Sequence, residues 1–501
     1  MNRLHRGSLV ALALSGLLTQ AYGDDRAISL LPPVKRLNAV SPQSEPVVPA
    51  ATSEASTVVV ETNAYDPPIT GGVKPRGANL PRAVGQTEAP VKPVSFAPQE
   101  SMPQPMTTAP APSFNTMEIQ VPTITLPDWS SIWDTGPTVP GDVEDPTWII
   151  SEYLIWGMKA AHTPALVTTS RTIDSLGRLN QPDTQILFGE DVALPWRQGF
   201  RVHMGSWFEP TETLGIDGSY MVLFNRSKFY AASGQANTLT ARPFFNVLNG
   251  EPDSGPISTP PSETNPNIVP TGGGIIIDMP SRFQSVEVNA ITNYRRGTAG
   301  RIDWFAGVRY FNLTEGMSIY EGLYVADPAA QLAGTTFAFQ DSFDTRNYLY
   351  TGQVGARFVA QRGCFSYTLT GKLGMGWGHQ AARIDGGTMI FDSVTFPQLY
   401  QGGFLTQASS TGNYNQDKFV FTPEIGIKLS YEMYDHVRFS LGYNFIFLSS
   451  VLRPGDLIDT RLNPNFLAPA TGTLAPALPQ PVFKDTSFWT HGVHFSIDLH
   501  Y

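Results

Sequence analysis

The stretch DKFVFTPEIGIKLSYEMYDHVRFSLGYNFIFLSSV, residues 417–451, holds two runs of alternating residues on either side of a tight turn. Large apolar residues occupy the odd positions from Phe419 to Met433, and again from Val437 to Phe447. Polar residues and glycine take most of the even positions. Period two is the pattern of a β-strand with one apolar and one polar face. The stretch therefore predicts an antiparallel hairpin that turns at YDH, residues 434–436.

The same pattern recurs between Trp148 and the terminal stretch SFWTHGVHFSIDLHY, residues 487–501. We count about ten such strands, near 149–157, 198–209, 213–226, 281–296, 300–314, 345–361, 364–383, 417–434, 436–452 and 487–501. The tight connections EPTET, RGTAG, QRGC and YDH alternate with long segments near 158–197, 227–280, 315–344, 384–416 and 453–486. This layout predicts an all-β fold, an antiparallel transmembrane β-barrel of about ten strands, possibly twelve, with tight periplasmic turns and long extracellular loops.

Backbone hydrogen bonding supports a barrel. An unpaired N–H or C=O is costly in hydrocarbon, so only a helix or a closed barrel can span a membrane. The chain contains no run of about twenty apolar residues that would form a spanning helix. Closure also pairs the terminal strand, which would otherwise be an exposed edge. A secreted β-sandwich is the competing fold, but it predicts shorter strands with turn signals every 8 to 12 residues or so.

Strand parity divides the side chains of the predicted barrel into two sets. The outer face carries aromatic residues of the kind that form girdles at membrane interfaces; we expect lipid-facing positions at Trp304, Tyr310, Tyr431, Tyr443, Trp489 and Tyr501. The opposite face carries charges of both signs; we expect lumen-lining positions at Arg301, Asp303, Arg309, Arg357, Lys372, Glu424, Lys428, Arg438 and Asp498. His491 falls on the outer face, where we expect it near an interface or under a neighbouring aromatic ring.

Composition narrows the class of function. Charged residues make up 15% of the 501 residues, well below the typical quarter of a soluble globular protein. The net charge of −10 argues against a nucleic-acid partner. The single cysteine, Cys364, excludes an internal disulfide framework and a cysteine-based metal cluster. No spacing of histidines indicates a metal site, so we expect neither a metal nor a cofactor.

The N-terminal part of the chain differs from the rest. Residues 1–23 read as a signal peptide, with Arg3 and Arg6 before a short apolar run and Ala21-Tyr22-Gly23 before the expected cleavage site. An uncleaved anchor is the alternative. Residues 24–147 are rich in proline, serine, threonine and alanine without a sustained apolar period. Such a segment cannot bury enough apolar area to fold, so it predicts a disordered, proline-rich periplasmic tether.

The segments WIISEYLIWGMKAAHTPALVTTS (148–170), LGRLNQPDTQILFGE (176–190) and GFRVHMGSWFEP (199–210) together resemble the entry module of a known family. This is the putative beta-barrel porin family seven, outer-membrane proteins found chiefly in planctomycetes. The resemblance extends over residues 148–501. Family members usually carry a second tryptophan beside the one at 156, where this chain has Gly157. The resemblance implies an outer-membrane barrel and no catalytic residues.

Several functions are compatible with such a barrel. About ten strands leave a narrow or blocked bore, so the inner charges either form a paired, rigid interior or line a selective, porin-like pore. A third hypothesis is that the proline-rich arm links the outer membrane to the cell wall or a periplasmic partner. We also expect the C-terminal strand, with its final aromatic residue, to be recognised by the barrel assembly machinery.

A hydrolase at the loop rim is the remaining hypothesis. The chain has no HExxH, GxSxG or Walker-type motif. Candidate acid and base residues in the long loops are His162, His379, Asp385, Asp456 and Asp459. Loop aspartates are more often turn formers than catalytic groups, so we expect no enzymatic activity.

Overall fold

The computed structural model describes residues 147–208, 213–234, 238–263, 265, 268–297, 300–330, 332–392, 396–434, 436–472 and 475–500. The predicted signal peptide, nearly all of the predicted tether and Tyr501 lie outside these residues. The description below therefore concerns the barrel and the segments between its strands.

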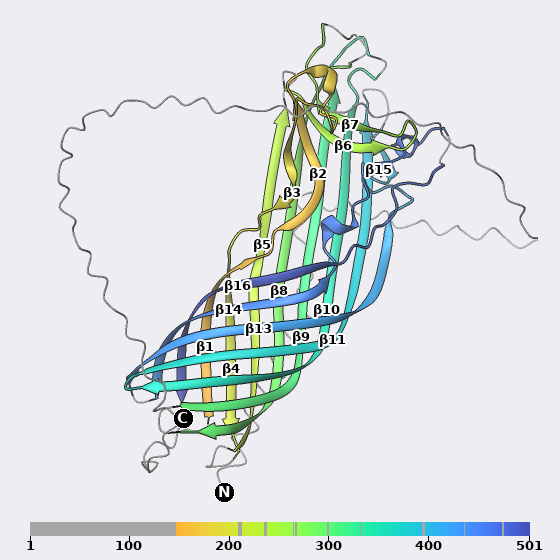
Figure 1. Cartoon of the computed structure of the whole chain (residues 1–501). Coiled ribbons are helices and arrows are strands. Elements are labelled where there is room, and N and C mark those ends of the chain that lie inside the picture. The colour runs from red at the N-terminus through yellow and green to blue at the C-terminus, as the bar shows by residue number, and fades with distance from the viewer. Residues whose placement is uncertain are drawn as a thin grey trace, which may run out of the picture. The chain divides into compact units, whose positions relative to one another are not determined.

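Ten antiparallel strands form a closed ring (Figure 1). Each barrel strand pairs with the barrel strands before and after it along the chain, and the first strand pairs with the last. This ring confirms the predicted barrel and its strand number. The strands are β1 (Thr147–Met158), β4 (Arg197–Trp207), β5 (Leu214–Gly234), β8 (Thr271–Arg296), β9 (Gly300–Val325), β10 (Thr336–Arg362), β11 (Phe365–Phe391), β13 (Gly412–Tyr434), β14 (Val437–Val451) and β16 (Thr486–His500).

The two ends of the ring differ. At one end, here called the turn end, short connections join β4 to β5, β8 to β9, β10 to β11 and β13 to β14. The β10–β11 turn places Gly363 at a φ of 59°, a left-handed conformation that glycine adopts without steric cost. The opposite end, called the loop end, carries the long connections. The alternation of short and long segments in the sequence thus corresponds to the two ends of one barrel.

The wall of the barrel is taller on one side. Strands β8 to β11 contain 26 or 27 residues, whereas β4 contains 11 and β14 contains 15. About 9 to 11 tilted residues suffice to span a membrane. The longest strands therefore continue beyond the membrane at the loop end, and they form what we call the tall wall (Figure 1).

The apolar face of the tall wall changes sides along its length. On β9, Trp304 and Val308 are exposed on the outer face, while Met317 and Ile319 are fully buried on the inner face. The reversal follows Tyr310, after which the outer positions from Asn312 to Ser318 are polar or glycine. We expect water to replace lipid outside the wall above this level, so that apolar side chains gain by turning inward.

The long connections build a second sheet at the loop end (Figure 1). Its strands are β2 (Ala161–Ser170), β3 (Thr184–Val192), β6 (Thr240–Asn246), β7 (Glu251–Ser258) and β15 (Arg461–Leu462). A short strand, β12 (Gln398–Gln401), pairs antiparallel with the loop-end part of β11. The 3₁₀ turns are η2 (Ile173–Ser175), η3 (Pro454–Leu457) and η4 (Pro464–Phe466). None of the helices in the described part of the chain is long and apolar enough to cross a membrane.

The second sheet packs on the tall wall through an apolar core. Val167 of β2 and Ile257 of β7 are fully buried in one cluster with Ile277 of β8 and Ile319 of β9. Burying these side chains stabilises the sheet against the wall by roughly 1.5–3 kcal/mol each. The sequence predicts loops for these segments, and the structure corrects this prediction with a five-stranded sheet.

Candidate functional site

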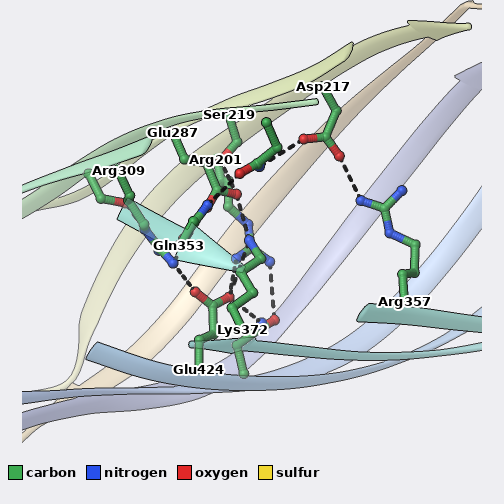
Figure 2. A network of polar contacts seen from close by, with 12 residues as sticks. Arg201, Asp217, Ser219, Glu287, Arg309, Gln353, Arg357, Lys372 and Glu424 are labelled. Carbon is green, nitrogen blue, oxygen red and sulfur yellow. Dashed lines mark hydrogen bonds and ion pairs between the residues drawn. The ribbon is translucent and has the colours of Figure 1, made fainter. Parts of the chain in front are cut away.

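Charged side chains from opposite walls meet inside the ring. Arg309 of β9 pairs with Glu424 of β13 across the bore and lies 3.5 Å from Glu287 of β8. Lys372 of β11 places its Nζ 2.6 Å from Glu287 Oε1 and 3.9 Å from Glu424 Oε1. Figure 2 shows these side chains converging from both sides of the ring. We call this cluster, completed by Arg201 and Glu152, the central network.

Arg201 of β4 completes the central network on the short side of the barrel. Its guanidinium pairs with Glu152 of β1, lies 3.9 Å from Glu424 Oε1 and donates to Asn444 Oδ1 at 3.1 Å. The network holds three cations and three carboxylates, and all six residues are buried. Since an unpaired buried charge is strongly unfavourable, this balance explains how the charges persist in a narrow interior.

Further ion pairs surround the central network. Arg357 of β10 donates to Asp217 Oδ2 of β5 at 2.8 Å, as Figure 2 shows. Asn289 donates to the other oxygen of Asp217 at 2.9 Å. Nearer the turn end, three pairs are Arg301–Asp303 at 3.2 Å, Lys428–Asp498 at 2.7 Å and Arg438–Glu432 at 3.6 Å. Ionic and amide groups therefore lie inside the ring from the central network to the turn end.

An apolar layer lies on the loop-end side of the central network. Phe283 stacks against Phe311 with ring centroids 6.0 Å apart and against Phe488 at 5.7 Å, and all three are fully buried. They belong to one buried cluster with Leu154, Trp156, Leu223, Leu349, Val420 and Ile446. The Arg309 guanidinium lies 4.3 Å from the Phe311 ring centroid, which joins the two layers.

Beyond the apolar layer, Arg453 connects the η3 segment to the tall wall. Its Nε and Nη2 donate to the two oxygens of Glu315 at 2.8 and 2.7 Å, and Nη1 donates to the carbonyl of Ala160 at 2.6 Å. Asn347 of β10 donates to the Leu452 carbonyl at 2.8 Å and accepts from the Leu452 amide at 2.7 Å. These buried hydrogen bonds hold residues 452–453 on the loop-end side of the apolar layer.

Between the central network and the turn end, the interior widens. Here lies a cavity of about 130 Å³, which we call the turn-end cavity. Its lining comes from both walls and includes Arg357, Thr368, Lys428 and His494. The central network borders the cavity through Arg201, Glu152, Lys372 and Glu424, so the cavity is closed toward the loop end.

The sequence matches one family over the whole ring. Residues 148–501 match the family described as Putative beta barrel porin-7 (BBP7). The chain belongs to this family. The match confirms the resemblance seen in the entry module and supports a place in the outer membrane. A comparison with curated proteins found no match.

Several solved structures of bacterial proteins show a low similarity to this chain. The outer membrane protease OmpT of Escherichia coli is 6% identical, covers 72% of this chain and 97% of its own, and has a TM-score of 0.33. A FadL homologue of Pseudomonas aeruginosa is 8% identical, covers 72% and 90%, and has a TM-score of 0.18. The toluene transporter TodX of P. putida is 6% identical, covers 71% and 90%, and has a TM-score of 0.16. We draw no inference about activity from scores this low.

The structure assigns partners to the charges predicted to line the lumen. It brings Arg309, Lys372 and Glu424 together in the central network, where Arg309 and Glu424 come from strands far apart in the sequence. It places Arg357 with Asp217, which is an inner position of β5. The other predicted residues form the three pairs nearer the turn end, through Arg301, Asp303, Lys428, Arg438 and Asp498.

The predicted outer residues lie on the outside of the ring. Trp304 is 49% exposed, and Tyr431 and Tyr443 are also exposed. Tyr310 and Trp489 are partly buried, and Tyr501 lies outside the described residues. His491 is surrounded by aromatic rings: its Nδ1 is 2.9 Å from Tyr443 Oη, and Trp489 and Trp196 lie at 5.1 and 5.8 Å between ring centroids. That these residues contact lipid stays a prediction.

Sequence reasoning missed two parts of the interior. Glu152 lies within the first segment that resembles the family, but alternation does not mark it as an inner charge, because its inner-face neighbours Leu154 and Trp156 are apolar. The apolar layer was missed because a polar lumen was expected throughout. The reversal of apolar parity after Tyr310 is the signal that could have revealed it.

Four of the five candidate acid and base residues of the loop rim lie in pairs. His379 Nδ1 is 2.7 Å from Asp417, His162 Nδ1 is 3.2 Å from Asp191, and Arg383 lies 2.8 Å from Asp385. Asp459 pairs with Arg461 at 2.9 Å. Burial raises the pKa of Asp456 to about 6. Within the described ranges, His, Cys, Asp and Glu side chains form no group of three that could hold a metal ion.

Proposed function

We propose that this chain is a closed outer-membrane barrel that anchors the second sheet at the membrane surface and does not conduct solutes. This proposal rests on the observation that side chains fill the interior of the barrel. The central network pairs its charges across the bore, and the apolar layer covers it on the loop-end side. The anchored sheet shares a buried core with the tall wall, so it is a folded part of the barrel.

Ion passage would require breaking both layers. A hydrated ion entering from the turn end would pass through the turn-end cavity and then meet Arg309 and Glu424, which are bonded to each other. It would then have to cross the apolar layer that contains Phe283, Phe311 and Phe488. An apolar constriction excludes water and so opposes ion passage. A rigid, salt-bridged interior is therefore better supported than a selective pore.

Planar bilayer recording tests this proposal. We expect the wild-type protein, whose folding is verified by heat-modifiable gel mobility, to insert without stepwise conductance. A general porin added to the same bilayers serves as the positive control. Reproducible ohmic steps from the wild-type protein would contradict the closed barrel and favour the porin reading.

We propose that the turn end faces the periplasm and that residues 1–23 direct export. Two features support this orientation. The short connections lie at one end of the barrel, and β1 begins and β16 ends at that same end. Bacterial barrels have short periplasmic turns and longer extracellular loops.

A tether function is favoured by the place where β1 begins. Residues 24–146 precede Thr147, the turn-end residue of β1, so the arm enters the barrel on the proposed periplasmic side. We propose that it binds the cell wall or a periplasmic partner. Deletion of residues 24–146 should leave heat-modifiable mobility unchanged and detach the outer membrane from the cell wall. Continued attachment would contradict the tether, but not the closed barrel.

We do not propose catalysis. His162, His379 and Asp385 at the loop end are each held in a pair with one oppositely charged side chain, and such a pair alone does not make the nucleophile, base and orienting group of a hydrolase site.

A further inference from the structure

The turn-end cavity is lined by an excess of cations. Three carboxylates border it, Glu152, Glu424 and Asp498, against six cations: Arg201, Arg301, Arg357, Lys372, Lys428 and Arg438. The partners of several of these cations stand outside the lining. Arg357 pairs with Asp217 and Arg301 pairs with Asp303. These two carboxylates lie inside the ring but outside the lining, so the lining itself carries more cations than carboxylates.

A row of hydroxyl groups faces the same space. Ser366, Thr368 and Thr370 are alternate residues of β11, and all three line the cavity. No hydrogen bond of their side chains occurs within the described part of the chain, and Ser366 is only 8% exposed. Hydroxyls that are sheltered and unbonded can donate to a ligand without first breaking a protein contact.

Strand pairing places the hydroxyls beside the cations. Thr368 is the register partner of Lys428 on β13, and Thr370 is the register partner of Arg357 on β10. In each case a hydroxyl donor and a cationic donor project from adjacent strands into one cavity. This is the arrangement that recognises an oxyanion, because the anion accepts from both.

The next strands leave room for a ligand and add a further polar group. Lys428 is paired with Gly442 of β14, and Gly442 is paired with His494 of β16. A side chain at Gly442 would overlap the His494 ring, so glycine lets the imidazole lie across β14. His494 is 2% exposed and lines the cavity, and among the described residues its Nδ1 has no hydrogen-bond partner.

We propose that the turn-end cavity is a binding site for a small oxyanion of the class of inorganic phosphate, held by Lys428, Arg357 and the hydroxyls of Thr368 and Thr370. The central network closes the cavity toward the loop end, so the anion binds and leaves from the turn end. This site goes beyond the proposed anchoring function, because a barrel can be closed whether or not its turn end holds an anion.

Titration calorimetry of the full-length, detergent-folded protein with inorganic phosphate tests the proposal. We expect saturable binding of one phosphate per chain, with sulfate competing. The double variant Thr368→Val, Thr370→Val should weaken binding by about tenfold or more, since a hydrogen bond to a charged group is lost at each position. Thr422→Val is the matched control, because Thr422 is a buried residue of β13 that does not line the cavity. The phosphate affinity of this variant should stay at the wild-type value.

A charge variant gives an independent measurement. Lys428→Met should weaken phosphate binding by about tenfold or more, whereas Lys484→Met, at an exposed position near the loop end, should not change it. Lys428→Met also leaves Asp498 without its cation, so heat-modifiable mobility must first show that the variant folds. If it does not fold, the wild-type measurement decides: phosphate affinity should fall as ionic strength rises. Absence of phosphate binding by the wild-type protein, or equal weakening by Thr422→Val, would overturn the proposal.

Discussion

Arg309 is the residue on which the central network depends most. It pairs with Glu424, lies 3.5 Å from Glu287 and covers the Phe311 ring. The change Arg309→Met keeps much of the aliphatic bulk and removes the charge. Two carboxylates then share fewer cations in a buried site, so we expect the free energy of unfolding to fall by about 3–5 kcal/mol. Urea unfolding from lipid vesicles, followed by gel mobility, measures the loss.

A double variant separates charge balance from packing. In Arg309→Met, Glu424→Gln the remaining network has two cations, Arg201 and Lys372, and two carboxylates, so the balance is restored. We expect this variant to recover part of the stability that the single change loses. A single variant as stable as the wild type would show that the network is solvated and that the interior is not closed.

Single residues also show what sequence alone can predict here. Arg309 and Glu424 were placed on the inner face because their neighbours alternate regularly, Val308 on β9 and Ile425 on β13. That they contact each other could not be predicted, because β9 and β13 are not adjacent and meet only when the ring closes. Parity assigns a face, whereas a partner across the bore depends on barrel diameter and stagger.

At the scale of strands, Arg242 connects the second sheet to the tall wall. It lies on β6, with Nη1 3.2 Å from Glu321 of β9 and Nη2 2.8 Å from Asp341 of β10. Two carboxylates thus share one guanidinium in a buried site beyond the spanning part of the strands. Burial, together with the nearby Asp341, raises the pKa of Glu321 to about 7 against the opposing effect of Arg242.

The raised pKa makes this junction pH-dependent. The unfolded chain releases the Glu321 proton near pH 4.5 and the folded chain near pH 7, so folding stability falls as the pH rises between these values and stays lower above pH 7. Glu321→Gln is permanently neutral. We expect it to remove this slope and to gain on the order of 3 kcal/mol over the wild type at pH 8, with little difference at pH 4.

Thermal unfolding followed by circular dichroism across this pH range measures the effect. Glu251→Gln, at an exposed carboxylate of β7 in the same sheet, is the control and should keep the wild-type pH profile. If Glu321→Gln has the same pH slope as the wild type, Glu321 is not the titrating group at this junction.

The tall strands show why their predicted limits were too short. The predicted strand 300–314 belongs to β9, which continues to Val325, and the predicted strand 281–296 belongs to β8, which begins at Thr271. In both, the apolar residues change face at the level where we expect water to replace lipid outside the wall, as at Tyr310 and Phe311. A strand predicted from apolar residues at every second position ends where the apolar residues switch between even and odd positions, although the backbone of the strand continues.

At the scale of the whole molecule, the ring was predictable and the second sheet was not. Alternating short and long connections indicate a barrel without knowledge of any contact. The second sheet instead rests on short pairings such as β15 with β6, only two residues long and parallel. Segments this short carry little periodicity, and their pairing is determined by the tall wall against which they pack.

Cys364 offers a direct test of how the molecule is oriented. It is the only cysteine of the chain, and it is exposed in the β10–β11 turn at the turn end. With the turn end in the periplasm, a polymer-linked maleimide too large to enter through porins should not label intact cells and should label cells whose outer membrane has been permeabilised. The matched control is Leu332→Cys in a Cys364→Ser background, at an exposed position of the β9–β10 connection. This cysteine should be labelled in intact cells, because it lies at the loop end. Labelling of Cys364 but not of Leu332→Cys in intact cells would reverse the proposed orientation, and the turn-end cavity would then open to the outside.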